Sequence, residues 1–218
     1  MDSTWEQETR SGDRFPFGEN WLAFLSSVDE RRIALAQDSL KKMLLLDSLE
    51  NKTFLDIGSG SGLFSLAARR MGAKVFSFDF DSQSVACTEE LRRRFSTDDD
   101  HWQIKAGSVL DLDFLSSLGQ FDVVYSWGVL HHTGNLKAAL SNACIPVKPG
   151  GFLFISVYND QGRASRYWHK VKSLYNRLPP PMRWLVLYPS LARLWGPTLV
   201  RDTLKLSPLS SWKNYWLC

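Results

Sequence analysis

Apolar residues recur along the chain with two spacings, one typical of helices and one typical of strands. Between Asp29 and Leu49 they follow the i, i+3, i+4, i+7 pattern of a helix with one buried face. Short runs rich in β-branched and aromatic residues predict five strands, at Thr53–Ile57, Lys74–Phe78, Trp102–Ala106, Phe121–Tyr125 and Phe152–Val157.

Helical patterns separate these strands, at about 62–71, 82–95 and 136–143, and Gly72 occupies the position of a C-terminal cap. A Lys-Pro-Gly-Gly turn at 148–151 precedes the last strand. Two pairs have the i, i+4 spacing of helix-stabilising ion pairs, Glu89 with Arg93 and Glu90 with Arg94. The alternation of strands and helices predicts an α/β fold, a doubly wound and mainly parallel sheet with helices on both faces.

Length and composition fit one buried core. The chain has 218 residues, of which 44% are hydrophobic and 22% are charged. We divide it into an N-terminal helical cap (1–50), a ligand-binding core (51–160) and a helical C-terminal region (161–218) that is substrate-side or capping. Two alternatives stay open for this last region: it is an insertion in a longer protein, or the sheet closes in an unfamiliar way.

The sequence shows neither a metal-binding pattern nor a signal peptide. Three cysteines without C-x-x-C spacing and four dispersed histidines form no recognisable metal set, so we predict no metal site. The polar start MDSTWEQETR has neither the basic beginning nor the apolar run of a signal peptide. These features favour a reduced, cytoplasmic protein.

Three glycines at alternating positions, Gly58, Gly60 and Gly62, join the first strand to the following helix. Glycine allows a tight turn and the close approach of a ligand to the backbone. The third glycine comes one position earlier than in the dinucleotide fingerprint, and Asp56 would repel a bound phosphate. Asp79 ends the second strand, where an acid can accept hydrogen bonds from both ribose hydroxyls. The pattern predicts a nucleoside with a positively charged substituent.

Five segments in order resemble the class I S-adenosylmethionine-dependent methyltransferases, over about residues 50–160. They are LDIGSGSG at 55–62, FDFD at 78–81, AGSVLDL at 106–112, FDVVYSWGVLHHTGN at 121–135 and VKPGGFLFISVY at 147–158. The resemblance, which is to the branch with ubiquinone-type and natural-product enzymes, implies a Rossmann-like fold and S-adenosylmethionine as cofactor. It also implies methyl transfer to an O, N or C atom of a small organic or lipid-like acceptor.

The resemblance and the strand ends together define an expected cofactor site. Its members are Asp56, Gly58, Ser59, Gly60, Gly62, Asp79, Phe80, Ser108, Val109 and Trp127. Ser108 stands where the family often has an aspartate, so we expect adenine contact through the backbone of Ser108 and Val109. Phe80 is either an adenine-stacking surface or a core residue, and Trp127 either faces the sulfonium or packs on the N-terminal helix.

His131 and His132 are the candidates for proton chemistry near the expected methyl position. Imidazole titrates near neutral pH, and a base helps when the acceptor is a hydroxyl. We take His131 as the catalytic candidate. A purely structural role is the alternative, because methyl displacement depends chiefly on alignment.

Residues 160–218 differ in charge from the rest of the chain. Ten Lys and Arg stand against Asp160 and Asp202, a local charge of +8, and five tryptophans are interleaved with them. This composition predicts either peripheral contact with anionic lipid or a large apolar substrate, or helices that cap the sheet. The net charge of +3 and the lack of an RNA-binding motif disfavour a nucleic-acid partner.

Two other functions stay open. In the family a pair of antiparallel strands follows the fifth strand, and we find no convincing pair before Cys218. A truncated sheet would suit a non-catalytic S-adenosylmethionine-binding module. A nicotinamide-dependent oxidoreductase shares the fold type but requires the later glycine. The sequence makes no prediction of the oligomeric state.

Overall fold

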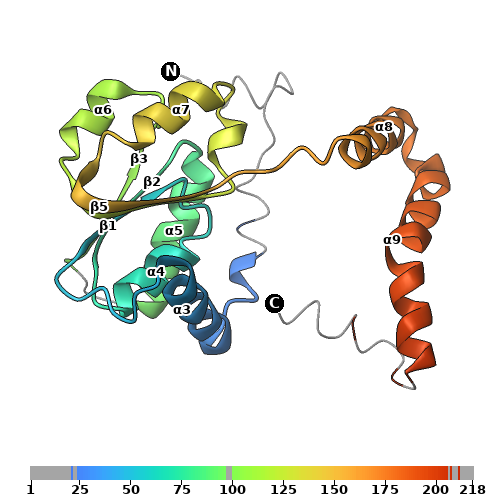
Figure 1. The fold of residues 1–218 in the computed structure, drawn as a ribbon, viewed down its shortest axis with the longest axis horizontal. Coiled ribbons are helices and arrows are strands. Elements are labelled where there is room, and N and C mark those ends of the chain that lie inside the picture. Colours follow the sequence, from blue (N-terminus) through green and yellow to red (C-terminus); the bar gives the residue numbers. More distant parts are fainter. Residues whose placement is uncertain (1–20, 22–23, 97–99, 206, 208–210, 212–218) are drawn as a thin grey trace. The chain divides into compact units, whose positions relative to one another are not determined.

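The computed structural model describes residues 21, 24–96, 100–205, 207 and 211 (Figure 1). Two compact units make up the chain, residues 1–158 and residues 159–218. Each is described by itself. Phe15, Phe17 and Trp21 form an aromatic cluster in the N-terminal part of the sequence. Phe15 and Phe17 lie outside the described residues, whereas Trp21 is described.

The first unit contains a five-stranded parallel sheet. Its strands are β1 (Thr53–Ile57), β2 (Lys74–Asp79), β3 (Trp102–Ala106), β4 (Phe121–Trp127) and β5 (Val147–Ser156). The strand order is β3-β2-β1-β4-β5, so the winding reverses between β1 and β4. Ligands of open α/β sheets bind beyond the carboxyl ends of the strands at such a reversal.

Helices cover both faces of this sheet, as Figure 1 shows. On one face lie α3 (Glu30–Leu44), α4 (Leu63–Arg70) and α5 (Ser82–Phe95); on the other lie α6 (Leu112–Ser117) and α7 (Leu136–Ala143). The predicted doubly wound α/β fold is confirmed.

Caps that the sequence encodes set several helix ends. The Asp29 side chain accepts a hydrogen bond from Arg32 N at the start of α3, and Asp81 accepts one from Gln83 N at the start of α5. Gly72 follows α4 with φ of 98°, which confirms the predicted glycine stop. The sequence analysis missed α6, because six residues are too few to show a helical period.

Two local predictions were wrong. The segment 148–151 is not a turn ahead of β5 but an irregularity within it, because Phe121 pairs with Val147 whereas Val123 pairs with Phe152. Extra residues in one strand of a pair loop out and bend that strand. In α5, Glu90 bonds both Arg93, at i+3, and Arg94, at i+4, so Arg93 pairs with Glu90 rather than Glu89.

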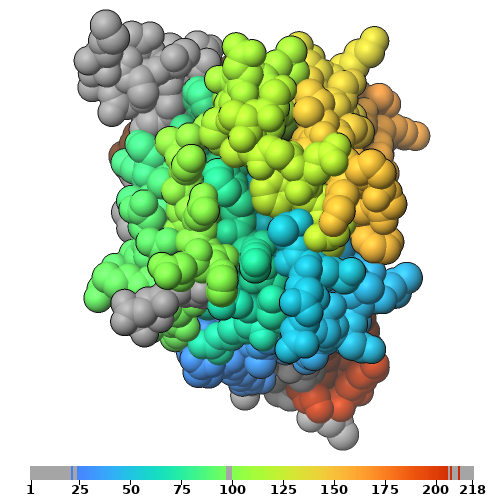
Figure 2. Space-filling model, turned by 90° about the vertical axis from the view of Figure 1, so that its left-hand side faces the viewer, coloured from blue at the N-terminus to red at the C-terminus, as the bar shows by residue number. Residues whose placement is uncertain are grey.

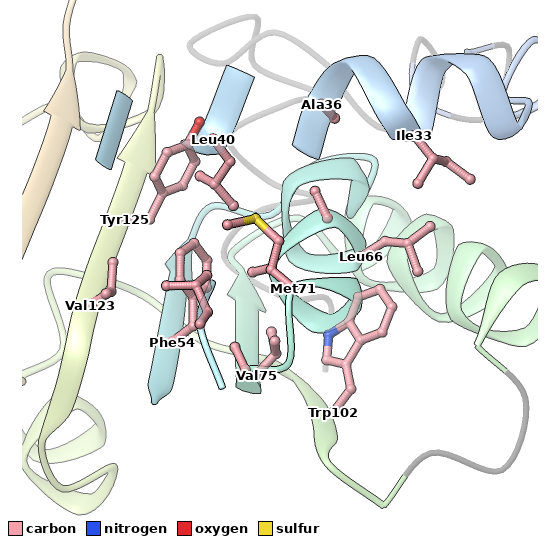
Figure 3. Packing of buried hydrophobic residues seen from close by; sticks show 14 of the residues in the cluster. Ile33, Ala36, Leu40, Phe54, Leu66, Met71, Val75, Trp102, Val123 and Tyr125 are labelled. Atoms are coloured by element: carbon pink, nitrogen blue, oxygen red, sulfur yellow. The ribbon is translucent and has the colours of Figure 1, made fainter. Parts of the chain in front are cut away.

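The face of the sheet beneath α3, α4 and α5 holds the larger hydrophobic core. Figure 3 shows Leu40 of α3 and Leu66 of α4 above Phe54, Val75 and Trp102 of the strands. Leu40, Leu66 and Phe54 are fully buried and Trp102 is 1% exposed. This burial fixes α3 and α4 on the sheet.

The second unit is helical, with α8 (Arg163–Arg177), a short η2 turn (Pro180–Met182) and α9 (Trp184–Leu204). Two cation–π contacts join the helices: the Arg183 guanidinium lies 5.3 Å from the Tyr175 ring and that of Arg193 lies 4.9 Å from the Tyr167 ring. Within the described residues β5 is the last strand, and the predicted helical C-terminal region is confirmed.

We expect Leu40→Ala to lower the free energy of unfolding by about 2–5 kcal/mol, because it opens a cavity in the core under α3. Leu35→Ala is the matched control, since Leu35 lies in the same helix and is 45% exposed. Denaturant unfolding of both variants measures the difference. Equal losses would contradict the assignment of the buried face of α3.

Candidate cofactor site

The glycine loop between β1 and α4 has a backbone that only glycine adopts easily. Gly58, Gly60 and Gly62 have φ of 79°, 55° and 79°. A Cβ on Gly58 would lie 2.4 Å from a methyl carbon of Val129, and one on Gly62 would lie 2.8 Å from a methyl carbon of Thr88. Both positive φ and close packing therefore require glycine in this loop.

Side chains from β2 and α5 hold the loop in place. Asp79 Oδ2 accepts a hydrogen bond of 2.9 Å from Gly60 N, and Thr88 Oγ1 donates one of 3.2 Å to Gly60 O. The hydroxyls of Ser59 and Thr88 are 3.0 Å apart. The structure thus joins Asp79 directly to Gly60 of the glycine loop, although the two residues are 19 positions apart in the sequence.

Asp79 is the best-supported member of the site. Burial raises the pKa of its carboxyl to about 6, against the lowering effect of hydrogen bonds from Asp81 N and Gly60 N. Gly60 N donates to Asp79 Oδ2, and Asp81 N donates to Asp79 Oδ1. Each oxygen offers about two acceptor positions, so both can still accept a hydroxyl.

Asp56 lies deeper than the sequence analysis placed it. Its side chain is 3% exposed, and Oδ2 accepts a hydrogen bond from Ser65 Oγ in α4. Burial raises the pKa of Asp56 to about 7, the Ser65 hydrogen bond lowers it, and the Asp79 charge raises it. The carboxylate is therefore a buried group under the loop rather than an open charge at its mouth.

The expected adenine side lies beyond the carboxyl end of β3. Gly107 N donates a hydrogen bond of 3.0 Å to Asp79 O, which ties this segment to the end of β2. Ser108 Oγ accepts from Leu110 N, and Val109 is 4% exposed. Phe80, directly after Asp79, is partly buried.

Trp127 ends β4 and is 48% exposed. Its ring is stacked on Phe154 of β5 at 6.0 Å and 2°, and lies 6.3 Å from Phe64 of α4. Trp127 therefore rests on α4 and β5. Its half-exposed ring stands at the carboxyl end of the sheet, where Ser126 Oγ donates to Ile57 O.

His131 lies in a short η1 turn (Leu130–His132) after β4. Both of its ring nitrogens are buried and have no hydrogen-bond partner within the described residues. Its ring packs 4.0 Å from that of His132 and 4.1 Å from that of Tyr158. Burial lowers the pKa of the His131 imidazole, so the ring is neutral at pH 7.

Three neighbours of the loop were missed by the sequence analysis. A Cβ on Gly60 would lie 2.8 Å from the Trp21 indole, so Trp21 covers the middle of the loop. Val129 packs on Gly58, and Thr88 binds Gly60. These contacts join residues distant in sequence, and the one available signal was the position of Trp21 within an aromatic cluster.

A separate hollow of about 460 Å³ opens at the opposite end of the sheet. Its lining includes the first residues of three strands, Thr53, Lys74 and Phe121. In Figure 2 the segments near residue 50, in cyan, and near residue 120, in yellow-green, are both seen on the face that is turned to the viewer. The glycine loop follows the last residue of β1, so this hollow is not the predicted site.

The sequence is similar to curated proteins that are named as methyltransferases. A 31% identity over 111 residues links the chain to a ubiquinone biosynthesis O-methyltransferase of Brucella ovis, covering 51% of this chain and 43% of that protein. The protein of the same name from Rhodopseudomonas palustris is 25% identical over 169 residues, 75% of this chain and 62% of that one. The chain thus spans about half the length of these relatives.

Solved structures share the fold. Magnesium protoporphyrin IX methyltransferase from Synechocystis, solved with S-adenosylhomocysteine, aligns with a TM-score of 0.56 and 18% identity, over 72% of this chain and 74% of that one. A putative methyltransferase of Haloferax volcanii, solved with its Trm112 activator, aligns with a TM-score of 0.53 and 24% identity over 70% and 64%.

A family described as methyltransferase domain matches residues 28–196, most of the chain and all five strands. The chain therefore belongs to the methyltransferase domain family.

Proposed function

We propose that this protein binds S-adenosylmethionine over the glycine loop and transfers its methyl group to a small organic or lipid-like acceptor. The hydrogen bond between Asp79 and Gly60 N carries the proposal. It places a carboxylate with spare acceptor capacity beside the glycine loop, at the reversal of strand order. This combination suits a nucleoside whose ribose faces the acid.

The other site residues have roles consistent with this placement. Phe80 and the backbone of Ser108 and Val109 contact the adenine, and Asp56 favours the cationic end of the cofactor. The exposed ring of Trp127 faces the methyl donor, because an aromatic face attracts a sulfonium cation. When bound, the cofactor supplies an activated methyl group; the chain binds and aligns it.

For an acceptor that is a hydroxyl, His131 is the proposed base. Its ring is neutral near pH 7, and both nitrogens lack a partner in the described structure. A buried ring nitrogen without a hydrogen bond lowers the stability of the fold unless another molecule supplies the missing partner. An acceptor hydroxyl that donates to His131 would satisfy the ring and lose its proton there. The O-methyltransferase names of the relatives favour oxygen as the acceptor atom.

We expect Asp79→Asn to weaken S-adenosylhomocysteine binding by roughly tenfold or more, because hydrogen bonds to a charged acceptor contribute about 1.5–3 kcal/mol each. Isothermal titration calorimetry measures this change. The control is Asp113→Asn, an exposed carboxylate in the first turn of α6. Unchanged affinity in Asp79→Asn, or tighter binding of NADH than of S-adenosylhomocysteine by the native chain, would contradict the proposed cofactor site.

We expect His131→Asn to lower kcat by about 100-fold with a phenolic acceptor while S-adenosylhomocysteine affinity is retained, because loss of a general base affects proton transfer only. The control is His101→Asn, at the amino end of β3 and far along that strand from the site. Steady-state methyl transfer from radiolabelled cofactor measures kcat for both variants. Cofactor binding without turnover on any phenol, amine or carbon acid would favour the non-catalytic alternative.

We also propose that the second unit contacts anionic lipid. Large apolar side chains of α9 are exposed, with Trp184 at 55%, Tyr188 at 64% and Val200 at 61%. The neighbouring α8 exposes five basic residues, Arg163, Arg166, Lys170, Lys172 and Arg177. Apolar area combined with basic charge favours an anionic membrane surface. Within the described chain, no helix meets the length and hydropathy needed to cross a bilayer.

We expect the protein to sediment with vesicles that contain phosphatidylglycerol and not with pure phosphatidylcholine vesicles. Lys170→Glu with Lys172→Glu should reduce this binding at least tenfold, because each basic residue near an anionic surface contributes about 1 kcal/mol. Lys42→Glu with Lys137→Glu, two exposed lysines of the first unit, is the matched control. Equal binding to both vesicle types would overturn the electrostatic part of the proposal.

A further inference from the structure

A continuous line of polar side chains crosses the larger hydrophobic core. Trp102 Nε1 of β3 donates a hydrogen bond of 2.9 Å to Ser77 Oγ of β2. Ser77 Oγ lies 2.7 Å from Ser65 Oγ of α4, which donates to Asp56 Oδ2 of β1 at 2.5 Å. All four side chains are at most 3% exposed. The line connects an edge strand with the residue that precedes the glycine loop.

Counting protons gives this line a direction. An indole N–H only donates, and each serine hydroxyl has a single proton. Ser65 gives its proton to Asp56, so in the contact between the two serines Ser77 is the donor. Every proton therefore points from Trp102 toward Asp56. An ionised Asp56 ends this line as an acceptor and has no proton of its own to place.

This line of polar side chains does not stabilise the hydrophobic core by packing. Its members lie among apolar residues of one core, and Asp56 is a carboxylate with little access to water. Buried polar groups and charges cost stability, and apolar side chains of similar size often replace them without loss. One direct hydrogen bond to the carboxylate, from Ser65, continues through Ser77 to Trp102, and this indicates a role for the charge of Asp56.

The surroundings of Asp56 otherwise oppose that charge. Burial and the nearby Asp79 of β2 both raise its pKa, and only the Ser65 hydrogen bond lowers it. Tyr125 of β4 faces it in register, with a buried hydroxyl that has no partner within the described residues. Asp56 and burial together raise the pKa of Tyr125, so that hydroxyl stays neutral. The serine line is thus the main support for the ionised carboxylate.

We propose that Ser65, Ser77 and Trp102 are positioning residues that hold Asp56 ionised beneath the glycine loop, so that its charge attracts the ammonium group that S-adenosylmethionine and S-adenosylhomocysteine share. This inference rests on the proposed cofactor site, and it assigns the residues that set the charge of one of its members. The effect should decrease along the line, being largest for Ser65 and smallest for Trp102.

The first test needs no cofactor. A ¹³C NMR titration of the Asp56 carboxyl, assigned with Asp56→Asn, gives its midpoint in Ser65→Ala, Ser77→Ala and Trp102→Phe. We expect each midpoint to move to higher pH, in that decreasing order. Ser84→Ala is the matched control, because Ser84 is a buried serine that donates to another carboxylate, Asp81. Unmoved midpoints in all three variants would overturn the proposal.

The second test measures S-adenosylhomocysteine affinity against pH. With an Asp56 pKa of about 7, affinity in the native chain should be roughly tenfold weaker at pH 6 than at pH 8. In Asp56→Asn the change of affinity near pH 7 should disappear. A change near pH 6 should stay, because Asp79 has a pKa of about 6. Ser65→Ala should bind about threefold more weakly at pH 7 and recover by pH 8.5.

The outcomes separate the two proposals. An equal loss of affinity at every pH in Ser65→Ala would show a merely structural role and overturn the inference. No binding of S-adenosylhomocysteine by the native chain would instead overturn the proposed cofactor site, while the NMR titration would still report whether the serines set the charge of Asp56.

Discussion

The structure depends on a loop that carries no side chains at three positions. Gly58, Gly60 and Gly62 adopt left-handed conformations, and Val129, Trp21 and Thr88 close on them from three different segments. Any Cβ there would meet one of these neighbours at less than 3 Å. The same absence of side chains lets a ligand approach the backbone closely at Gly58 and Ser59, which stay partly exposed. Fold and site therefore share one constraint, and a substitution in the loop would affect both.

A buried carboxylate, Asp56, and a partly buried one, Asp79, add an electrostatic cost at this point. Asp56 and Asp79 each have a pKa raised by burial, and the charge of Asp79 raises that of Asp56 further. Within the described residues neither carboxylate forms an ion pair; Asp56 accepts a hydrogen bond from Ser65, and Asp79 accepts hydrogen bonds from Gly60 N and Asp81 N. A site that holds two acids close together without a cation is suited to a ligand that brings positive charge and hydroxyl donors.

The sequence predicted what local pattern determines. The strands Thr53–Ile57 and Trp102–Ala106 and the helices at 82–95 and 136–143 have the expected bounds, because period and capping residues lie within each segment. The irregularity in β5 was not predictable, since it depends on pairing with β4. Within the site, strand order brings Asp79 to Gly60, as the motif implied. The contacts of Trp21, Val129 and Ser65 are tertiary, and no spacing along the chain encodes them.

Charge is divided between the two units in a way that matches two different ligands. Residues 160–218 carry a net charge of +8 and the rest of the chain carries −5, which together give the net charge of +3. The acidic unit contains the glycine loop with Asp56 and Asp79, which a cationic cofactor requires. The basic unit exposes apolar side chains on α9 and basic ones on α8, which an anionic or lipid-like surface requires. A uniform charge of either sign would weaken one of these interactions, so the division itself supports separate tasks for the two units.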